Sequence, residues 1–381
     1  MVAAIAIDAR YGNNPISGIG RYTLNLLSGM MQGEMQHELT VFVSRAADLP
    51  VYITQSGLCE AVVVPGNPHN PWDQRFLHAE LYRRRIDLLH TPDAFAPLLW
   101  REGKIVVTIH DIIPLVCRRS FHSGYKARLA PLWRFWLKLQ CRRADAIITV
   151  SRQSEADLKR HLAVPAEKVH VVLNGVEPMK TPTAEQREEI RSRLGLTGRT
   201  ILYVGRRDPT KNLGLLVKAF SILRSHSSYD VKLVLAGRPD ERYREAEEEA
   251  ARLNVTGSVI HTGHLDDGAL AALYCEADVF VFPSIYEGFG LPLLEASGFG
   301  IPVIASDIPV FSEVLGDAGI LVDPNAPHAW ADAIESVLNE PALAAMLAQK
   351  GLLRAGQMTA SRQASATVQL YNRFLNTNSE G

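Results

Sequence analysis

Residues 281–300 read Val281-Phe-Pro-Ser-Ile-Tyr-Glu-Gly-Phe-Gly-Leu-Pro-Leu-Leu-Glu-Ala-Ser-Gly-Phe-Gly300. The apolar run 277–282 is typical of a buried strand, and the proline after it ends that strand. Gly288 and Gly290 then indicate a loop. Pro292 favours the first turn of a helix, because the N–H that proline lacks would have no partner there. This stretch therefore predicts a strand, a glycine loop and a helix in direct succession.

Two carboxylates flank the predicted start of this helix: Glu287 precedes it and Glu295 lies just inside it. Glycines before a helix let backbone N–H groups face a ligand, and the helix dipole favours an anion there. Carboxylates would not bind phosphate, but they suit the hydroxyls of a sugar or a ribose. The pattern indicates a nucleotide-sugar site. The alternative is an ordinary strand–loop–helix unit, with one surface acid and one acid complementing the helix dipole.

The run Glu-Gly-Phe-Gly-Leu-Pro-Leu-Leu-Glu-Ala, followed by Gly300-Ile-Pro-Val-Ile-Ala-Ser306, resembles the Glu-x₇-Glu signature of retaining glycosyltransferases of family 4. The resemblance extends over nearly the whole chain. It implies an α/β protein with the GT-B fold, in which two Rossmann-like, doubly wound domains face each other across a cleft. It also implies that Glu287 holds donor sugar hydroxyls and that Glu295 binds the ribose. Further donor contacts are expected from residues 289–291, namely Phe289, Gly290 and Leu291.

The composition fits an ordinary globular enzyme, with 47% apolar and 21% charged residues in 381. That length predicts two domains. No run reaches the roughly 18 apolar residues of a spanning helix, and the N-terminus predicts a first strand rather than a signal peptide. The four cysteines are scattered, as expected of reduced thiols in the cytosol. We expect a cytoplasmic protein, with a possible peripheral position at the inner face of the plasma membrane.

Apolar runs alternate with helical stretches along both halves of the chain, which is typical of parallel, doubly wound sheets. We predict a first, acceptor-binding domain over 1–178 and a second, nucleotide-sugar-binding domain over 179–360. The linker is expected near the start of the polar, turn-rich segment 177–198. The last helix, about 361–377, is expected to pack back on the first domain, as in GT-B proteins.

Two places in the first half carry candidate functional residues. The strand ending at Ile109 is followed by His110 and Asp111, and ligands of open α/β sheets bind at the carboxyl ends of strands. A lone histidine is more often structural, but the resemblance places His110 beside the donor sugar as a catalytic residue. Asp111 would orient the imidazole or cap the following turn. Gly18 and Gly20 form an incomplete glycine fingerprint, and the resemblance brings them near the donor diphosphate.

A second glycine turn opens the second domain, where Arg206 and Lys211 follow a strand that ends at Gly205. Two cations at a strand–helix junction can neutralise a diphosphate, whereas an isolated pair is more often solvated. The resemblance makes Arg206 and Lys211 the diphosphate clamp, with Arg207 pointing elsewhere. No Asp-x-Asp metal site is present, so we expect no metal and no cofactor.

The net charge of −1 hides an asymmetry between the two halves of the chain. Residues 1–180 contain 22 Lys/Arg and 16 Asp/Glu, whereas residues 181–381 contain 18 and 25. The near-neutral total argues against nucleic-acid binding. The segment Arg118–Arg143 has eight basic residues, no acid, and interleaved Trp, Phe and Leu. It fits either an anionic membrane surface or an ordinary amphipathic helix with a solvated basic face.

The sequence thus predicts a retaining, metal-independent transfer of a hexose from a nucleoside diphosphate sugar to an acceptor hydroxyl. Ser17-Gly-Ile-Gly-Arg-Tyr22 and Asn174-Gly-Val-Glu177 resemble bacterial mannosyl- and rhamnosyltransferases of O-antigen or exopolysaccharide synthesis. The expected donor is GDP-mannose or a related GDP-sugar, with UDP-sugars still open. The expected acceptor is a glycan or a polyprenyl-linked saccharide. The alternatives are a nucleotide-sugar epimerase, which would act without acceptor, and a catalytically silent carbohydrate-binding assembly subunit.

Overall fold

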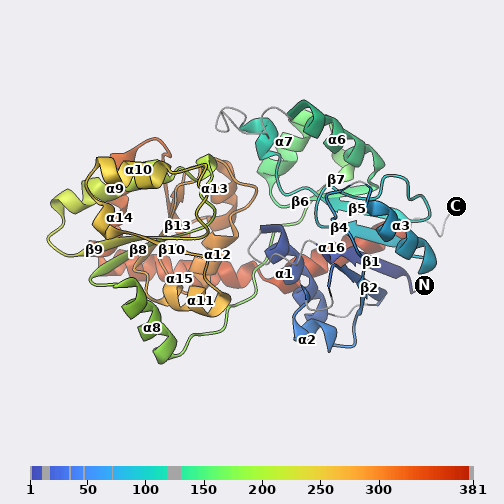
Figure 1. Cartoon of the computed structure of the whole chain (residues 1–381), viewed down its shortest axis with the longest axis horizontal. Helices are drawn as coiled ribbons and strands as arrows, with labels where there is room; N and C mark the ends of the chain where they lie inside the picture. Colours follow the sequence, from blue (N-terminus) through green and yellow to red (C-terminus); the bar gives the residue numbers. More distant parts are fainter. Residues whose placement is uncertain are drawn as a thin grey trace. The chain divides into compact units, whose positions relative to one another are not determined.

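The computed structural model describes residues 2–10, 18–33, 36–45, 48–70, 72–117 and 130–376 (Figure 1). The described residues divide into two compact units. The first unit contains the chain up to Glu177 and again from Met358 onward, and the second contains Pro178–Gln357. Each unit is built around one parallel sheet.

The sheet of the first unit has seven parallel strands in the order β3-β2-β1-β4-β5-β6-β7. Chain order reverses beside β1, which creates the switch point where doubly wound sheets bind ligands. The strands are β1 (Ala4–Asp8), β2 (Glu38–Val43), β3 (Glu60–Val63), β4 (Leu88–Thr91), β5 (Lys104–Thr108), β6 (Ala146–Thr149) and β7 (Val169–Val171).

Helices cover both faces of this sheet. On one face, Phe42, Leu89 and Ile147 belong to an apolar cluster with residues of α3 (Gln74–Arg83), α6 (Ala130–Arg143) and α7 (Arg152–Leu162). On the other face lie α1 (Gly18–Gln32) and the last helix, α16 (Ala360–Asn376), packed against each other (Figure 1). Short helices complete the unit: α2 (Val51–Thr54), α4 (Ile113–Val116) and the 3₁₀ helix η4 (Ala166–Lys168).

The second unit has six parallel strands in the order β10-β9-β8-β11-β12-β13. They are β8 (Arg199–Val204), β9 (Val231–Ala236), β10 (Val259–Gly263), β11 (Val279–Phe282), β12 (Val303–Ser306) and β13 (Gly319–Val322). In Figure 1, α9 (Leu213–His226), α10 (Glu245–Arg252) and α14 (Pro327–Asn339) lie on one side of the sheet, and α8 (Ala184–Leu194), α11 (Asp267–Cys275) and α15 (Pro341–Gln357) on the other. The unit also contains η5 (Pro209–Lys211), η6 (Thr256–Ser258), α12 (Leu291–Gly298) and α13 (Pro309–Leu315).

The two parallel sheets confirm the predicted α/β class, and one local prediction needs correction. The segment 177–198, predicted to be turn-rich, contains the helix α8. Its missed signal is a capping box, in which the Thr183 side chain accepts from Gln186 N and Gln186 returns a bond to the Thr183 backbone. In the same unit, α10 begins only at Glu245, because Asp240 holds Arg242 and the Tyr243 amide in a turn.

Candidate active site

The loop between β11 and α12 is shaped by Gly290, the residue just before the helix. Its φ of +100° is accessible to glycine and costly for other residues. A Cβ there would also lie 3.0 Å from Phe311 Cε1 and 3.1 Å from Leu293 Cδ1. Phe289 and Leu291 are buried. Only the backbone groups of these three residues are therefore suited to a ligand, as expected of a helix N-terminus that binds an anion.

Glu287 of this loop meets Lys211, which lies 76 residues earlier in the chain. Lys211 Nζ donates to Glu287 Oε1 over 2.6 Å, and Ser284 Oγ donates to the same oxygen over 2.9 Å. The two charged side chains are only 11% and 12% exposed. The acid predicted for sugar hydroxyls and the cation predicted for phosphate thus form one ion pair. Ser284 is a partner that sequence reasoning missed.

Backbone contacts hold Lys211 in this position. Asp208 caps the short helix η5 by accepting from the Thr210 amide over 3.1 Å. The Thr210 carbonyl in turn accepts from Ile285 N over 2.8 Å, which ties η5 directly to the β11–α12 loop. The pairing of Lys211 with Glu287 therefore rests on fixed backbone rather than on two flexible side chains.

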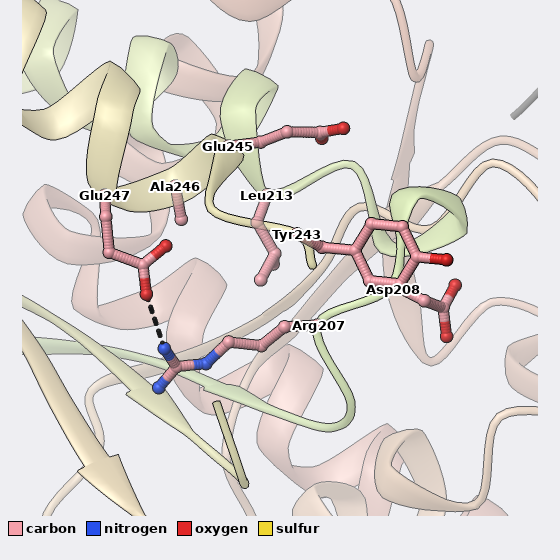
Figure 2. A pocket seen from close by; sticks show the side chains of 7 residues that line it. All are labelled: Arg207, Asp208, Leu213, Tyr243, Glu245, Ala246 and Glu247. Carbon is pink, nitrogen blue, oxygen red and sulfur yellow. Dashed lines mark hydrogen bonds and ion pairs between the residues drawn. The ribbon is translucent and has the colours of Figure 1, made fainter. Parts of the chain in front are cut away.

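Arg206 and Arg207, although adjacent, are held very differently. Arg206 is exposed, and its carbonyl accepts from the buried Tyr203 hydroxyl over 2.6 Å. Burial, followed by the nearby Glu287 and Asp208 charges, raises the pKa of Tyr203 well above its usual value, so the hydroxyl keeps its proton. The Arg207 side chain instead points inward to Glu247, with 2.7 Å between Nη1 and Oε1 (Figure 2).

Figure 2 shows the small pocket in which Arg207 lies, lined by Asp208, Leu213, Tyr243 and residues 245–247. Arg207 is 5% exposed and lies within 3.4–3.5 Å of the carbonyl oxygens of Leu235 and Gly237. A buried guanidinium that is already paired with a carboxylate supports structure. Arg207 therefore belongs to the packing of this unit, and only Arg206 presents its charge to solvent.

Glu295 lies in the second turn of α12, and its partner comes from α11. Tyr274 OH donates to Glu295 Oε2 over 3.1 Å, and the Tyr274 ring is fully buried and stacked on Phe299 at 5.3 Å. Glu295 itself is half-buried. The carboxylate is thereby oriented while part of it still reaches solvent. Sequence reasoning missed Tyr274, because nothing in α11 marks it apart from its apolar neighbours.

In the first unit, His110 follows the carboxyl end of β5. Its Nε2 lies 2.9 Å from the Pro92 carbonyl, which can only accept, so Nε2 carries the proton and Nδ1 is the acceptor. The Tyr22 ring packs edge-on against the imidazole, with 4.7 Å between centroids. Burial lowers the pKa of His110, while the Asp93 carboxylate acts in the opposite direction. His110 is therefore held as a neutral imidazole.

Asp111 caps the turn after His110, since its Oδ1 accepts from Ile113 N over 2.9 Å. Two roles were predicted for Asp111, and this hydrogen bond corresponds to the second, the cap of the following turn. The His110 backbone is held separately, because Ser154 Oγ donates to its carbonyl over 2.9 Å. Ser154 lies in the first turn of α7, where Ser151 is the N-cap.

Beneath His110 lies a buried polar chain that sequence reasoning did not find. Tyr22 OH and Thr108 Oγ1 are 3.0 Å apart, and Thr108 Oγ1 is 2.8 Å from His90 Nε2. His90 Nδ1 is 2.5 Å from the hydroxyl of Tyr371, which belongs to α16. Burial lowers the pKa of His90 to about 3 and raises that of Tyr22 to about 12. The chain is thus uncharged, and it links the last helix to the packing around His110.

The two predicted glycines occupy the start of α1. Gly18 is its first residue and is exposed, whereas Gly20, two residues further on, is buried. Residues 11–17, which precede them, lie outside the described residues. The structure gives these glycines the position expected of a helix N-terminus and does not itself assign them a ligand.

The basic segment is described only from residue 130 onward, and its first part, including Arg118, Arg119, Lys126 and Arg128, lies outside the described residues. The remainder forms α6, which has two rows on its outer face. One row is Leu132, Phe135 and Leu139, and beside it Arg134, Lys138 and Arg142 repeat at four-residue spacing. Leu132 and Phe135 are 62% and 60% exposed. No helix among the described residues has the length and apolar character required to cross a bilayer.

Comparison with known proteins extends over both units. Residues 186–354 match the family described as glycosyl transferases group 1, and residues 16–180 match glycosyltransferase family 4. The O-antigen chain mannosyltransferase B of Escherichia coli is 28% identical, with 94% of this chain and 96% of that protein aligned. The D-inositol 3-phosphate glycosyltransferase of Xylanimonas cellulosilytica is also 28% identical, with 92% and 89% aligned.

A solved structure, sucrose-phosphate synthase of Thermosynechococcus elongatus, superimposes with a TM-score of 0.77. The match covers 99% of this chain and 100% of that chain. Because the identity is 23%, the match shows a shared fold and nothing further. The two family matches divide the chain as the two units do, and each unit presents its candidate residues at the carboxyl ends of its strands. The chain is thus a glycosyltransferase of family 4 with the GT-B fold.

Proposed function

We propose that the protein transfers a hexose, mannose or rhamnose, from a GDP-linked sugar to a hydroxyl of a glycan or lipid-linked acceptor in cell-surface polysaccharide synthesis. The observation that carries this proposal is the Lys211–Glu287 ion pair beside the N-terminus of α12. It joins a cation suited to phosphate and an acid suited to hydroxyls at one point. The mannose assignment draws its support from similarity to the O-antigen chain mannosyltransferase of Escherichia coli.

Each candidate residue has a role in the proposed reaction. Lys211, Arg206 and the amides at the start of α12 neutralise the diphosphate as it leaves. Glu287 accepts hydrogen bonds from sugar hydroxyls, and Glu295, oriented by Tyr274, accepts from the ribose. The neutral imidazole of His110 stabilises charge near the reacting carbon without repelling it.

We propose that transfer retains the anomeric configuration by front-face substitution. The bond from C1 to the phosphate oxygen breaks with its electron pair leaving on the phosphate. The acceptor oxygen bonds to C1 from the same face, and its proton passes to the phosphate oxygen. The anomeric configuration of the product, read by NMR, tests this step. An inverted product would contradict it.

Donor binding is tested by thermal unfolding with GDP, UDP, ADP and their sugars. A ligand that binds only the folded state, present at a hundred times its Kd, stabilises it by about 2.7 kcal/mol. We expect GDP and GDP-mannose to raise the melting temperature most. If only UDP-sugars stabilise the protein, the donor is a UDP-sugar rather than a GDP-sugar. If no nucleotide raises the melting temperature, the proposed function is contradicted. Conversion of the donor to an epimer without acceptor would favour the epimerase.

We further propose that the outer face of α6 contacts an anionic membrane that presents a lipid-linked acceptor. Basic side chains near an anionic leaflet contribute about 1 kcal/mol each, and salt screens them. Flotation with phosphatidylglycerol vesicles should show binding at low salt and its loss near ~0.5 M salt. Replacing Arg134, Lys138 and Arg142 with Gln should weaken binding more than replacing Arg152, Lys159 and Arg160 of α7. Equal binding to neutral vesicles would overturn the proposal.

A further inference from the structure

The segment between β3 and α3, described for residues 64–70 and 72–73, lies along the carboxyl edge of the first sheet. It begins beside β2, where Val64 N donates to Val43 O over 2.8 Å. At its far end, Gln74 Nε2 donates to the carbonyls of Pro68 and Phe95 over 2.6 and 2.8 Å. Phe95 lies in the segment after β4, so the loop passes the ends of β2 and β1 to reach β4. This is the edge on which α/β sheets bind their ligands.

Side chains within the loop hold its backbone in place. Asp73 Oδ2 accepts from Asn67 N over 2.8 Å, and Asn67 Oδ1 accepts from His69 N over 2.9 Å. Asn70 Oδ1 accepts from Trp72 N over 3.1 Å. A loop already ordered in the free protein loses little conformational entropy when it binds a ligand.

The fixed loop presents an unusual set of side chains to solvent. Trp72 is 80% exposed, although an indole ring offers one of the largest apolar surfaces of any side chain. His69 is 51% exposed, and its Nε2 lies 3.3 Å from Asp93 Oδ2. An exposed aromatic face, a carboxylate and an imidazole are together the groups that complement a pyranose ring, which has apolar C–H faces and a rim of hydroxyls.

This set connects to the reacting centre through Asp93. Asp93 follows Pro92, whose carbonyl bonds His110 Nε2 over 2.9 Å. His69 therefore lies close to His110, whereas Trp72 is three residues further along the chain, up to about 10 Å away.

We propose that Trp72, His69 and Asp93 form a subsite for an inner sugar of the acceptor. The acceptor is then an oligosaccharide whose terminal residue is glycosylated near His110 while a preceding residue packs on Trp72. This proposal rests on the function proposed above. It specifies in addition that the acceptor contains at least two sugars, and it names the residues that recognise the inner one.

Calorimetry with mannose and mannotriose tests the subsite without any donor. We expect the wild-type protein to bind mannotriose more tightly than mannose, and Trp72→Ala to reduce the ratio of the two affinities about tenfold, the size of one aromatic contact. Trp72→Phe should retain most of the ratio. Leu99→Ala is the matched control, because Leu99 is also 80% exposed in this unit. A wild-type protein that binds mannotriose no better than mannose overturns the subsite.

Turnover and vesicle binding separate the remaining outcomes. In transfer from GDP-mannose, the ratio of kcat/KM for mannotriose over mannose should fall with Trp72→Ala in parallel with the affinities. If transfer occurs but this ratio is unchanged, the subsite is wrong while the proposed function stands. If Trp72→Ala instead abolishes binding to phosphatidylglycerol vesicles and leaves both ratios unchanged, Trp72 is a membrane anchor and the subsite is overturned.

Discussion

The carboxyl edges of the two sheets hold their candidate residues by opposite means. In the first unit, His110 rests on a backbone carbonyl and an aromatic edge, above a chain of uncharged, fully buried groups. In the second unit, Glu287 and Lys211 are both charged residues and are held to each other across 2.6 Å. The same parallel architecture thus supports a neutral site in one unit and a charged site in the other.

The difference follows from what each edge is proposed to meet. A diphosphate is an anion and needs fixed cations and amides, whereas a reacting carbon that gains positive charge would be opposed by an imidazolium. Burial lowers the pKa of His110 despite the opposing Asp93 and Asp111 carboxylates, which keeps the imidazole neutral. Pairing keeps Lys211 and Glu287 in their mostly buried positions. Four measurements test whether pairing in one unit and burial in the other act in this way.

The largest effect is expected from Lys211→Met, which leaves the Glu287 carboxylate mostly buried without its cation. Removing one partner of a buried ion pair costs about 3–5 kcal/mol, so the free energy of unfolding in urea should fall by about 3 kcal/mol. Affinity for GDP, measured by calorimetry, should fall roughly ten- to hundredfold, because a charged hydrogen bond to phosphate is lost.

Arg207→Met is the control, since Arg207 is equally buried but pairs with Glu247. It should lower stability by a similar amount and leave GDP affinity nearly unchanged. Combining Lys211→Met with Glu287→Gln should recover much of the stability without recovering affinity. If Lys211→Met and Arg207→Met lose the same affinity for GDP, Lys211 does not bind the diphosphate.

The next effect concerns the uncharged chain in the first unit. The pKa of His90 is about 3 in the folded protein and about 6.5 in an unfolded chain. Between these values only the unfolded chain binds the proton, so the stabilisation is complete above pH ~6.5 and is lost as pH falls. From pH 6.5 to 5 the loss is about 2 kcal/mol, at 1.36 kcal/mol per unit.

Urea unfolding at pH 7 and pH 5 measures this loss, and His90→Gln should reduce it. Burial also lowers the pKa of His110, His170 and His261, which adds dependence of the same sign. The difference between wild type and variant therefore isolates His90. The exposed His226 provides the control, and His226→Gln should leave the pH dependence unchanged. An unaltered slope in His90→Gln would show that His90 is not the buried, neutral group described.

A smaller effect is expected from Tyr274→Phe, which removes the hydrogen bond to Glu295 and keeps the ring stacked on Phe299. Loss of about 1 kcal/mol should weaken GDP binding roughly fivefold. Affinity for pyrophosphate, which has no ribose, should not change. Tyr229→Phe is the control, because the buried Tyr229 hydroxyl has no hydrogen-bond partner among the described residues. If Tyr274→Phe weakens the binding of GDP and of pyrophosphate equally, Glu295 does not bind the ribose.

The smallest effect is expected from removal of divalent metal. Transfer should continue in excess EDTA, because Arg206, Lys211 and the α12 amides supply the positive charge that a metal would otherwise provide. The initial rate of transfer from GDP-mannose is the measurement. A rate abolished by EDTA and restored by manganese would contradict the proposed diphosphate site and would reopen the comparison between the two units.

Much of the architecture and several candidate positions could be read from local sequence. Apolar runs predicted the strands, because a parallel strand is buried on both faces. Pro292 and Gly290 predicted where α12 begins, because each restricts or permits specific backbone angles. The family signature singled out Glu287 and Glu295. These features depend on residues close together in the chain, and a single sequence contains them.

Only the tertiary structure decided which of these residues meet. Lys211 and Glu287 are 76 residues apart, and His90 and Tyr371 are 281 apart, so their contacts depend on strand order and helix packing. Burial likewise separated two adjacent arginines, sending Arg207 into the interior and leaving Arg206 exposed. No local pattern distinguishes such neighbours, because the environment that selects between them comes from distant parts of the chain.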